Sequence, residues 1–178
     1  MLGKILCVRI KTPAKALLLI ITFVIVGLTT FLYVPKQFDS SSFFFDKNAL
    51  QQVLNLIRTS KRQILVEMYS FTHGDVVREL EAKKRAGLDV RVIVDDNPEN
   101  EALAKAKFDV RFEGTPRMFH RKLAIVDEQW IWIGSTNWTY GGFGKNAEVD
   151  LLMSSPDHAY NLVRQFEQDW AKAKRRPK

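Results

Sequence analysis

Short apolar runs alternate with polar segments from residue 43 to the end of the chain. The runs that are rich in β-branched and aromatic residues predict strands over Phe43–Phe45, Gln63–Tyr69, Val90–Val94, Val110–Phe112, Leu123–Val126, Trp130–Ile133 and Val149–Met153. Apolar residues spaced by three or four positions predict helices over Lys47–Arg58, Val76–Ala86, Glu101–Lys107 and Pro156–Ala173, and the glycines of Trp138–Asn146 predict an irregular loop. A strand, a helix and a strand follow one another over residues 63–94, which indicates a βαβ unit. We therefore expect an α/β domain with a mixed, largely parallel sheet flanked by helices.

The N-terminal part of the chain has a different pattern. Ala16–Val34 is a run of nineteen residues without a charge, and as a helix it would be about 28 Å long, close to the thickness of a bilayer core. We expect an N-terminal signal anchor or transmembrane segment in residues 1–35 and a linker over 36–42. A cleaved signal peptide is the alternative, and the protein would then be secreted. Either reading places the domain outside the cytoplasm, in the periplasm or at the cell surface.

The net charge of +7 is unevenly distributed along the chain. Nine of the 27 basic residues lie in 1–35 and in the basic tail 172–178, which leaves 18 basic against 20 acidic residues in 36–171. The expected domain, 43–171, is therefore not globally basic, and the high isoelectric point is weak evidence for a nucleic-acid partner. With one cysteine and three histidines, the sequence excludes an intrachain disulfide and has no zinc-binding spacing.

The segment His120–Asn137, HRKLAIVDEQWIWIGSTN, contains most of the candidate chemistry. His120 and Lys122 share one face of an extended chain, Asp127 lies in the turn between two strands, and Ser135 and Asn137 follow the second strand. An imidazole can act as a nucleophile, an ammonium and an amide can hold phosphate oxygens, and a carboxylate can orient the imidazole. These residue types together indicate attack on a phosphodiester. His120 alone would suggest only a hairpin with a surface histidine.

The order HxKxxxxD, followed after six residues by GSxN, resembles the HKD signature of the phospholipase D superfamily. Val66–Thr72 and Lys83–Gly87 are also similar to this family, and the resemblance covers roughly residues 43–171. With one motif in a short chain, the sequence resembles the small Nuc-type endonucleases and the mitochondrial cardiolipin hydrolase group. It therefore implies a phospholipase D-like fold.

The resemblance also implies roles for individual residues. Two copies of the chain would form a homodimer with one shared active site, in which His120 of one subunit is the nucleophile and His120 of the other is the general acid. Lys122 and Asn137 would hold the phosphoryl oxygens, and Ser135 would hydrogen-bond within the motif. Asp127 would orient or stabilise the histidine, and Glu148 would orient a catalytic histidine. No cofactor and no metal is required.

The substrate stays open at this point. The first hypothesis is a non-specific nuclease that cuts DNA or RNA, and the second is a phospholipase D that acts on phospholipids of the membrane. A third is a nucleic-acid-binding or uptake protein without activity. Basic residues near the motif, Arg117, Arg121 and Lys145, would suit any phosphodiester. The remaining candidates are weaker: we interpret His73 as a turn residue, Asp95 and Asp96 as loop residues, and the tryptophans beside the motif as sheet residues that could otherwise stack on bases.

Overall fold

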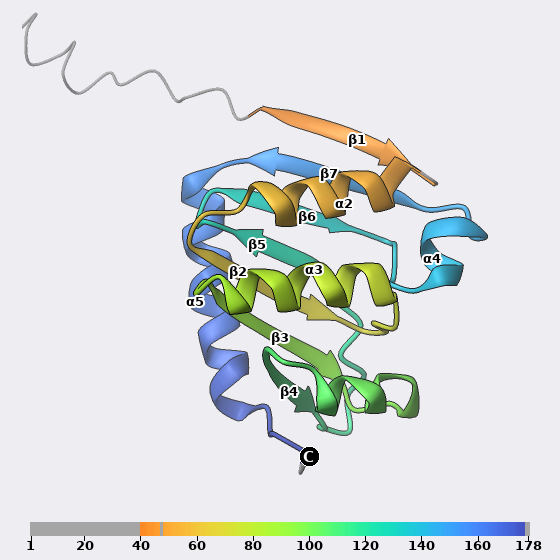
Figure 1. Cartoon of the computed structure of the whole chain (residues 1–178), viewed down its shortest axis with the longest axis vertical. Helices are drawn as coiled ribbons and strands as arrows, with labels where there is room; N and C mark the ends of the chain where they lie inside the picture. Colours follow the sequence, from red (N-terminus) through yellow and green to blue (C-terminus); the bar gives the residue numbers. More distant parts are fainter. Residues whose placement is uncertain (1–39, 47, 177–178) are drawn as a thin grey trace, which may run out of the picture. The chain divides into compact units, whose positions relative to one another are not determined.

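The computed structural model describes residues 40–46 and 48–176, and in this part of the chain seven strands form one sheet in the order β1-β7-β6-β5-β2-β3-β4 (Figure 1). The strands are β1 Ser41–Phe45, β2 Gln63–Met68, β3 Asp89–Asp95, β4 Asp109–Glu113, β5 Lys122–Val126, β6 Trp130–Gly134 and β7 Val149–Ser154. The helices are α2 Asn48–Thr59, α3 Gly74–Arg85, α4 Tyr140–Gly144 and α5 Pro156–Lys172, with a 3₁₀ helix, η1, at Pro98–Lys105.

The sheet is mixed, as predicted, but the expectation that it is largely parallel is wrong. Only the pairs β2–β3 and β3–β4 are parallel, and the four other pairs between described strands are antiparallel. The βαβ unit over residues 63–94 accounts for the first parallel pair. The β5–β6 hairpin then packs beside β2 in the opposite direction, and β7 and β1 continue that antiparallel half.

Helices cover the two faces of the sheet unequally. In Figure 1, α2 and α3 lie in front of the sheet and α5 lies behind it. Successive side chains of each strand point to opposite faces, so Val66 joins the core under α2 and α3 whereas Leu65 joins the core under α5. The domain therefore has two apolar cores, one on each face of the sheet.

Several element boundaries differ from those predicted. A short helix, α4, interrupts the expected loop over residues 138–146, and the helix expected at 101–107 is the 3₁₀ helix η1. Strand β1 begins at Ser41, inside the expected linker. The helix predicted over Val76–Ala86 is α3, which starts two residues earlier, at Gly74. Asp75 therefore lies within its first turn, and Gly87, with a φ of 91°, follows its end.

The C-terminal residues pack against β4. The backbone of Lys174 pairs with that of Phe112 through two hydrogen bonds, and Arg176 contacts Asp96 and lies over the Phe112 ring. Arg175 forms an ion pair with Asp109 at 2.9 Å. The described part of the basic tail is thus bound along one edge of the sheet, where its charges are partly neutralised.

The predicted anchor, Ala16–Val34, lies outside the described residues. Among the helices in residues 40–46 and 48–176, none is both long and apolar enough to cross a bilayer.

Candidate active site

His120 and Lys122 lie where β5 begins. Because β5 runs antiparallel to β2, this end of β5 is beside the end of β2, and Lys122 is paired with Met68. The Tyr69 amide donates to the Arg121 carbonyl at 2.9 Å, and the Phe119 amide donates to the Asp95 carboxylate at 2.9 Å. These bonds fix the backbone on both sides of His120.

The side chains of His120 and Lys122 contact each other. The Lys122 Nζ lies 3.0 Å from His120 Nε2 and 3.2 Å from the His120 carbonyl oxygen. A lysine ammonium can only donate, so this contact fits the imidazole tautomer in which Nε2 accepts and Nδ1 carries the proton. The centroid of the Tyr69 ring lies 4.7 Å from the centroid of the imidazole ring. The same Tyr69 centroid lies 5.2 Å from the Lys122 Nζ.

The environments of these two residues differ. His120 is exposed, whereas Lys122 is only 7% exposed. Burial lowers the pKa of Lys122, and the carboxylate of Glu148 opposes this effect by raising it. The site therefore combines an accessible imidazole with a desolvated ammonium, whose interaction with an anion is stronger than in water.

The Gly-Ser-Thr-Asn segment forms a turn that is held against β7. A side chain at Gly134 would overlap Asp150 and the Val149 carbonyl, so only glycine fits there. The Ser135 hydroxyl donates to the Glu148 carboxylate and accepts from the Val149 amide at 3.1 Å. Ser135 was predicted to hydrogen-bond within the motif, but its hydroxyl instead contacts Glu148 and Val149, which follow the motif. Glu148 also accepts from Asn146 at 3.0 Å. Within residues 40–46 and 48–176 of one chain, the Glu148 carboxylate makes these hydrogen bonds and none to a histidine, so its predicted contact with a histidine is not seen.

The next two residues of the turn join it to neighbouring segments. The Thr136 hydroxyl donates to the buried carboxylate of Asp150 at 2.6 Å, and burial raises the pKa of Asp150. The Asn137 side-chain oxygen accepts from the Ser70 amide at 3.2 Å. Since this oxygen is used, the amide nitrogen of Asn137 is the group that could donate to a ligand.

Asp127 lies at the other end of β5, and its predicted role beside His120 is wrong within one chain. Lys122 and Asp127 are five positions apart in an extended strand, which separates them by about 16 Å. The Asp127 carboxylate accepts from the backbone amides of Lys61, Arg62 and Gln63 at 2.8, 2.7 and 3.0 Å. Burial would raise the pKa of Asp127, but these amides and the Arg62 charge outweigh it and hold the pKa below its usual value.

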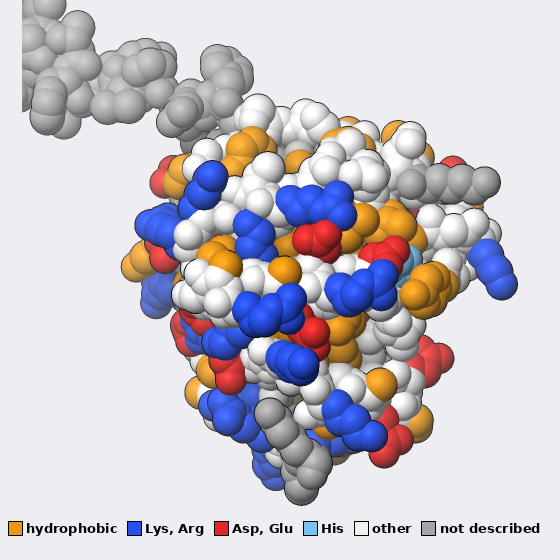
Figure 2. Space-filling model, viewed as in Figure 1, with side chains coloured by type: hydrophobic (Ala, Val, Ile, Leu, Met, Phe, Trp, Pro, Cys, Tyr) orange, Lys and Arg blue, Asp and Glu red, His pale blue; other side chains and the backbone are white. Residues whose placement is uncertain are grey.

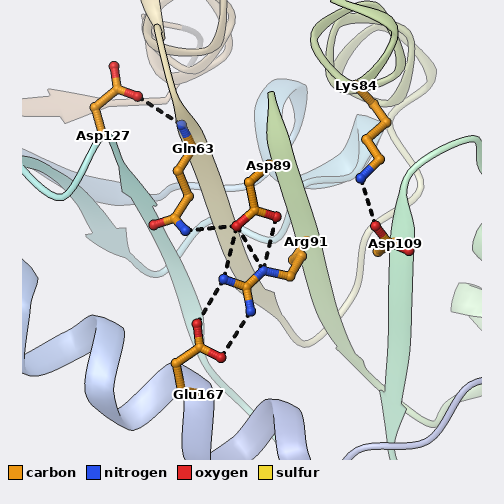
Figure 3. A network of polar contacts seen from close by, with 7 residues as sticks. All are labelled: Gln63, Lys84, Asp89, Arg91, Asp109, Asp127 and Glu167. Atoms are coloured by element: carbon orange, nitrogen blue, oxygen red, sulfur yellow. Dashed lines mark hydrogen bonds and ion pairs between the residues drawn. The ribbon is translucent and has the colours of Figure 1, made fainter. Parts of the chain in front are cut away.

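The hydrogen bonds of Asp127 belong to a polar network that crosses the starts of β2 and β3 and reaches α5 (Figure 3). The Gln63 side chain donates to Asp89 at 2.8 Å, and Arg91 bridges Asp89 to Glu167 on α5. Asp127 therefore joins the β5–β6 turn to the start of β2 and, through that start, to β3 and α5.

Several other candidate residues are buried or held in contacts with other parts of the domain. Arg121 is bound to Glu67 and Asp169 on the α5 side of the sheet, so it is not available to a phosphate beside His120. Trp132 and Trp138 are completely buried, so neither can stack on a base. His73 is buried between Tyr140 and Phe143, and burial lowers its pKa.

Sequence reasoning missed several residues that support the site. Tyr69 contacts both His120 and Lys122, Ser70 holds Asn137, and Asp150 holds the turn at Thr136. The available signal was the strand-end segment over residues 66–72, which places polar groups at the end of β2. Residues 40–46 and 48–176 contain no group of three or more His, Cys, Asp or Glu side chains that could bind a metal ion.

Comparison with known proteins places this geometry in a family context. The family described as "Cardiolipin synthase, PLD-like domain" matches residues 53–170. Mitochondrial cardiolipin hydrolase of Homo sapiens is 25% identical over 130 residues, which cover 70% of this chain and 52% of the relative. Phospholipase D of Rickettsia conorii is 23% identical over 128 residues, covering 68% of this chain and 62% of the relative. The chain thus spans about half to three fifths of the length of these curated relatives.

Solved structures share the fold. Nuc from Salmonella typhimurium, a phospholipase D family member, has a TM-score of 0.73 and 24% identity, covering 79% of this chain and 99% of Nuc. NucT from Helicobacter pylori has a TM-score of 0.70 and 21% identity, covering 78% of this chain and 99% of NucT. At these identities the likeness is one of fold.

Proposed function

We propose that this chain hydrolyses phosphodiester bonds through a phosphohistidine on His120. It belongs to the phospholipase D superfamily, through the family described as "Cardiolipin synthase, PLD-like domain", and its relatives include proteins named phospholipase D and cardiolipin hydrolase. The single observation that best supports this proposal is the pairing of His120 Nε2 with the buried Lys122 ammonium. It presents a neutral, accessible nucleophile beside a desolvated positive charge.

The proposed reaction has two displacements on phosphorus. In the first, His120 Nε2 attacks phosphorus, the bond to the leaving oxygen breaks, and a second histidine gives that oxygen a proton. In the second, this histidine takes a proton from water, the water oxygen attacks phosphorus, and the bond to His120 breaks. Lys122 turns from Nε2 to a non-bridging oxygen when substrate binds, and the Asn137 amide nitrogen donates to another, so both oppose the charge that develops.

The second histidine is proposed to come from a second copy of the chain. His73 is buried among aromatic rings and His158 is hydrogen-bonded to Ser155, so within the described residues neither supplies a proton beside His120. A two-fold dimer would instead bring two copies of His120 together.

An exposed part of the sheet supports this proposal. On the α5 side, the cross-strand row Phe43, Leu151, Ile133 and Leu123 runs from the sheet edge toward His120. Phe43 is 65% exposed and Ile133 is 44% exposed, whereas Leu123 is buried. Helix α5 covers only the inner part of this row. The outer part is an exposed apolar surface, and in the proposed dimer it would pack against the same surface of the partner.

A charge placed on this surface tests the dimer. We expect Ile133→Arg to give a monomer in analytical ultracentrifugation and to lose most of its activity. Ala82→Arg, an exposed position on α3 on the other face, should stay dimeric and active. An active wild-type monomer would contradict the shared site.

We propose nucleic acid as the substrate, on the basis of the size and fold of the domain. The structural match covers 99% of Nuc and 99% of NucT, so the domain has the extent of these small proteins. By contrast, it spans only about half to three fifths of the curated relatives that are named for lipids. The sequence also resembles the Nuc-type endonucleases, which supports DNA or RNA as the substrate.

A phospholipid is the second candidate, and one cavity favours it. A cavity of about 400 Å³ adjoins His120 and Lys122, and Leu123, Ile133 and Leu162 form its apolar part. An acyl chain would fit such walls, and the curated relatives are named for lipids.

One assay separates these substrates. The full-length chain in detergent, with EDTA present, is incubated with single- and double-stranded DNA, with RNA, and with vesicles of phosphatidylcholine or cardiolipin. We expect nucleic acid to be cut and the lipids to stay intact, with no activity in His120→Asn. Lipid turnover with intact DNA and RNA would contradict the nuclease proposal. Binding of DNA without cleavage of any substrate would indicate a nucleic-acid-binding protein instead.

A further inference from the structure

Arg121 lies between the two proposed reacting residues, but its side chain is on the opposite face of the sheet. Its Nη1 donates to Glu67 at 2.7 Å and to Asp169 at 2.6 Å. Its guanidinium lies 5.1 Å from the centroid of the Phe119 ring. The three charged side chains come from β2, the start of β5 and α5, so the cluster joins three elements directly behind His120.

This cluster is costly to bury. Glu67 is 1% exposed, and burial raises its pKa, against the hydrogen bond and charge of Arg121, which lower it. Its Oε1 has no hydrogen-bond partner in the described part of the chain. Buried ion pairs of this kind contribute little net stability, because apolar residues of similar volume usually serve as well or better. Stability alone therefore gives no reason for a buried carboxylate at this position.

The backbone shows what the cluster can do. The carbonyl of Arg121 accepts the Tyr69 amide, and Tyr69 in turn contacts the side chains of His120 and Lys122. The Arg121 side chain is held to α5 and β2. This fixes the backbone at Arg121, the one residue that separates His120 from Lys122. A displacement of about 1 Å in a reacting group can lower a rate by about a hundredfold.

We propose that Glu67, Arg121 and Asp169 form a positioning clamp, which sets His120 and Lys122 in their reactive arrangement without contacting substrate. This inference rests on the proposed phosphodiesterase function. It assigns the residue between His120 and Lys122 to the scaffold of the site, in place of the phosphate-binding role that its charge suggests.

The test separates positioning from stability. In the full-length chain, Arg121→Met leaves Glu67 buried and unpaired, so its thermal midpoint should fall. The double variant Glu67→Met/Arg121→Met should regain a midpoint near that of the wild type. We expect kcat for bis(p-nitrophenyl) phosphate to stay at least about tenfold low in the double variant, with KM within about twofold. The matched control Arg91→Met/Glu167→Met removes an ion pair between the sheet and α5 at the other edge (Figure 3) and should keep the wild-type kcat.

Recovery of kcat together with the midpoint in the double variant would overturn the proposal. If that variant does not fold, Arg121→Lys provides the same test, because a single ammonium cannot reproduce the geometry of the guanidinium; wild-type kcat in Arg121→Lys would also overturn it.

Hydrogen–deuterium exchange gives a readout that needs no activity. Exchange of peptides that contain the Tyr69 amide should be faster in the folded double or Lys variant than in the wild type and the Arg91 control. Unchanged exchange would overturn the clamp. A wild type that cleaves no phosphodiester would contradict the proposed function, while this exchange measurement would still decide on the clamp.

Discussion

At the start of β5, the exposed His120 contacts the buried Lys122 and the Tyr69 ring, whereas at its other end the carboxylate of Asp127 is enclosed by three backbone amides. Both ends belong to one sequence motif. At the first end, the side chains of His120 and Lys122 can bind a ligand. At the second end, the Asp127 carboxylate is already hydrogen-bonded to backbone amides of the same chain. Within one short motif, His120 and Lys122 are therefore placed to react with a ligand, whereas Asp127 stabilises the fold.

The physical reason for this division is the geometry of the strand. Residues two apart in a strand share a face, which brings His120 and Lys122 together. A carboxylate about 16 Å further along cannot reach them. It can reach the chain that enters β2, because β2 and β5 are neighbours and the start of one lies beside the end of the other.

The largest expected effect is that of His120. Removing a nucleophile typically lowers kcat by several orders of magnitude, so we expect His120→Asn to lose at least about a thousandfold in kcat on a phosphodiester. Because the side chain is exposed, the thermal midpoint should change little. His158→Asn is the matched control and should retain activity.

Lys122 should have the next largest effect. Loss of a donor that stabilises developing charge typically lowers kcat about 10²–10³-fold, which we expect for Lys122→Met. Its urea unfolding midpoint should not fall, since the substitution removes a desolvated ammonium from a buried position. Lys105→Met, at an exposed lysine in the last turn of η1, should leave both quantities near wild type. A stability loss without a fall in kcat would place Lys122 with Asp127 as an architectural residue.

The pH dependence sharpens this end of the strand further. Burial lowers the pKa of Lys122, so its ammonium should lose its proton, and kcat/KM should fall, at a lower pH than an ordinary lysine would require. Glu148 raises that pKa, so Glu148→Gln should move the alkaline limb of the pH–rate profile to still lower pH. An unmoved or higher limb would show that Glu148 does not act on Lys122.

Asp127 should have the smallest effect on catalysis and a clear effect on stability. Asp127→Asn replaces a charged acceptor of three amides, which we expect to lower the free energy of unfolding by about 1–3 kcal/mol while kcat stays within about threefold. Because the native pKa of Asp127 is lowered, its contribution is present above the ordinary carboxyl pKa and is lost as pH falls through the native value. Wild type and variant should therefore converge in stability at acid pH. A large fall in kcat at unchanged stability would return Asp127 to the chemistry.

Local pattern was sufficient for some features and not for others. The short apolar run over residues 123–126 predicts the strand, and the polar residues at 127–129 predict the turn. Because side chains two apart on a strand share a face, the strand also predicts that His120 and Lys122 point the same way. The direction of the neighbouring strand is not a local property, so the antiparallel contact of β5 with β2 was missed. The roles predicted for Asp127 and Arg121 failed for the same reason. The groups that bind them come from residues 61–67 and from α5, which are distant in the sequence.

The most direct test of the proposed chemistry is to trap the enzyme during turnover of a phosphodiester, under alkaline conditions that preserve phosphohistidine, and to map the covalent adduct by mass spectrometry. We expect the adduct on His120, at no more than one per two chains, and none in His120→Asn. An adduct on another residue, or full turnover by His120→Asn, would contradict the proposed role of His120.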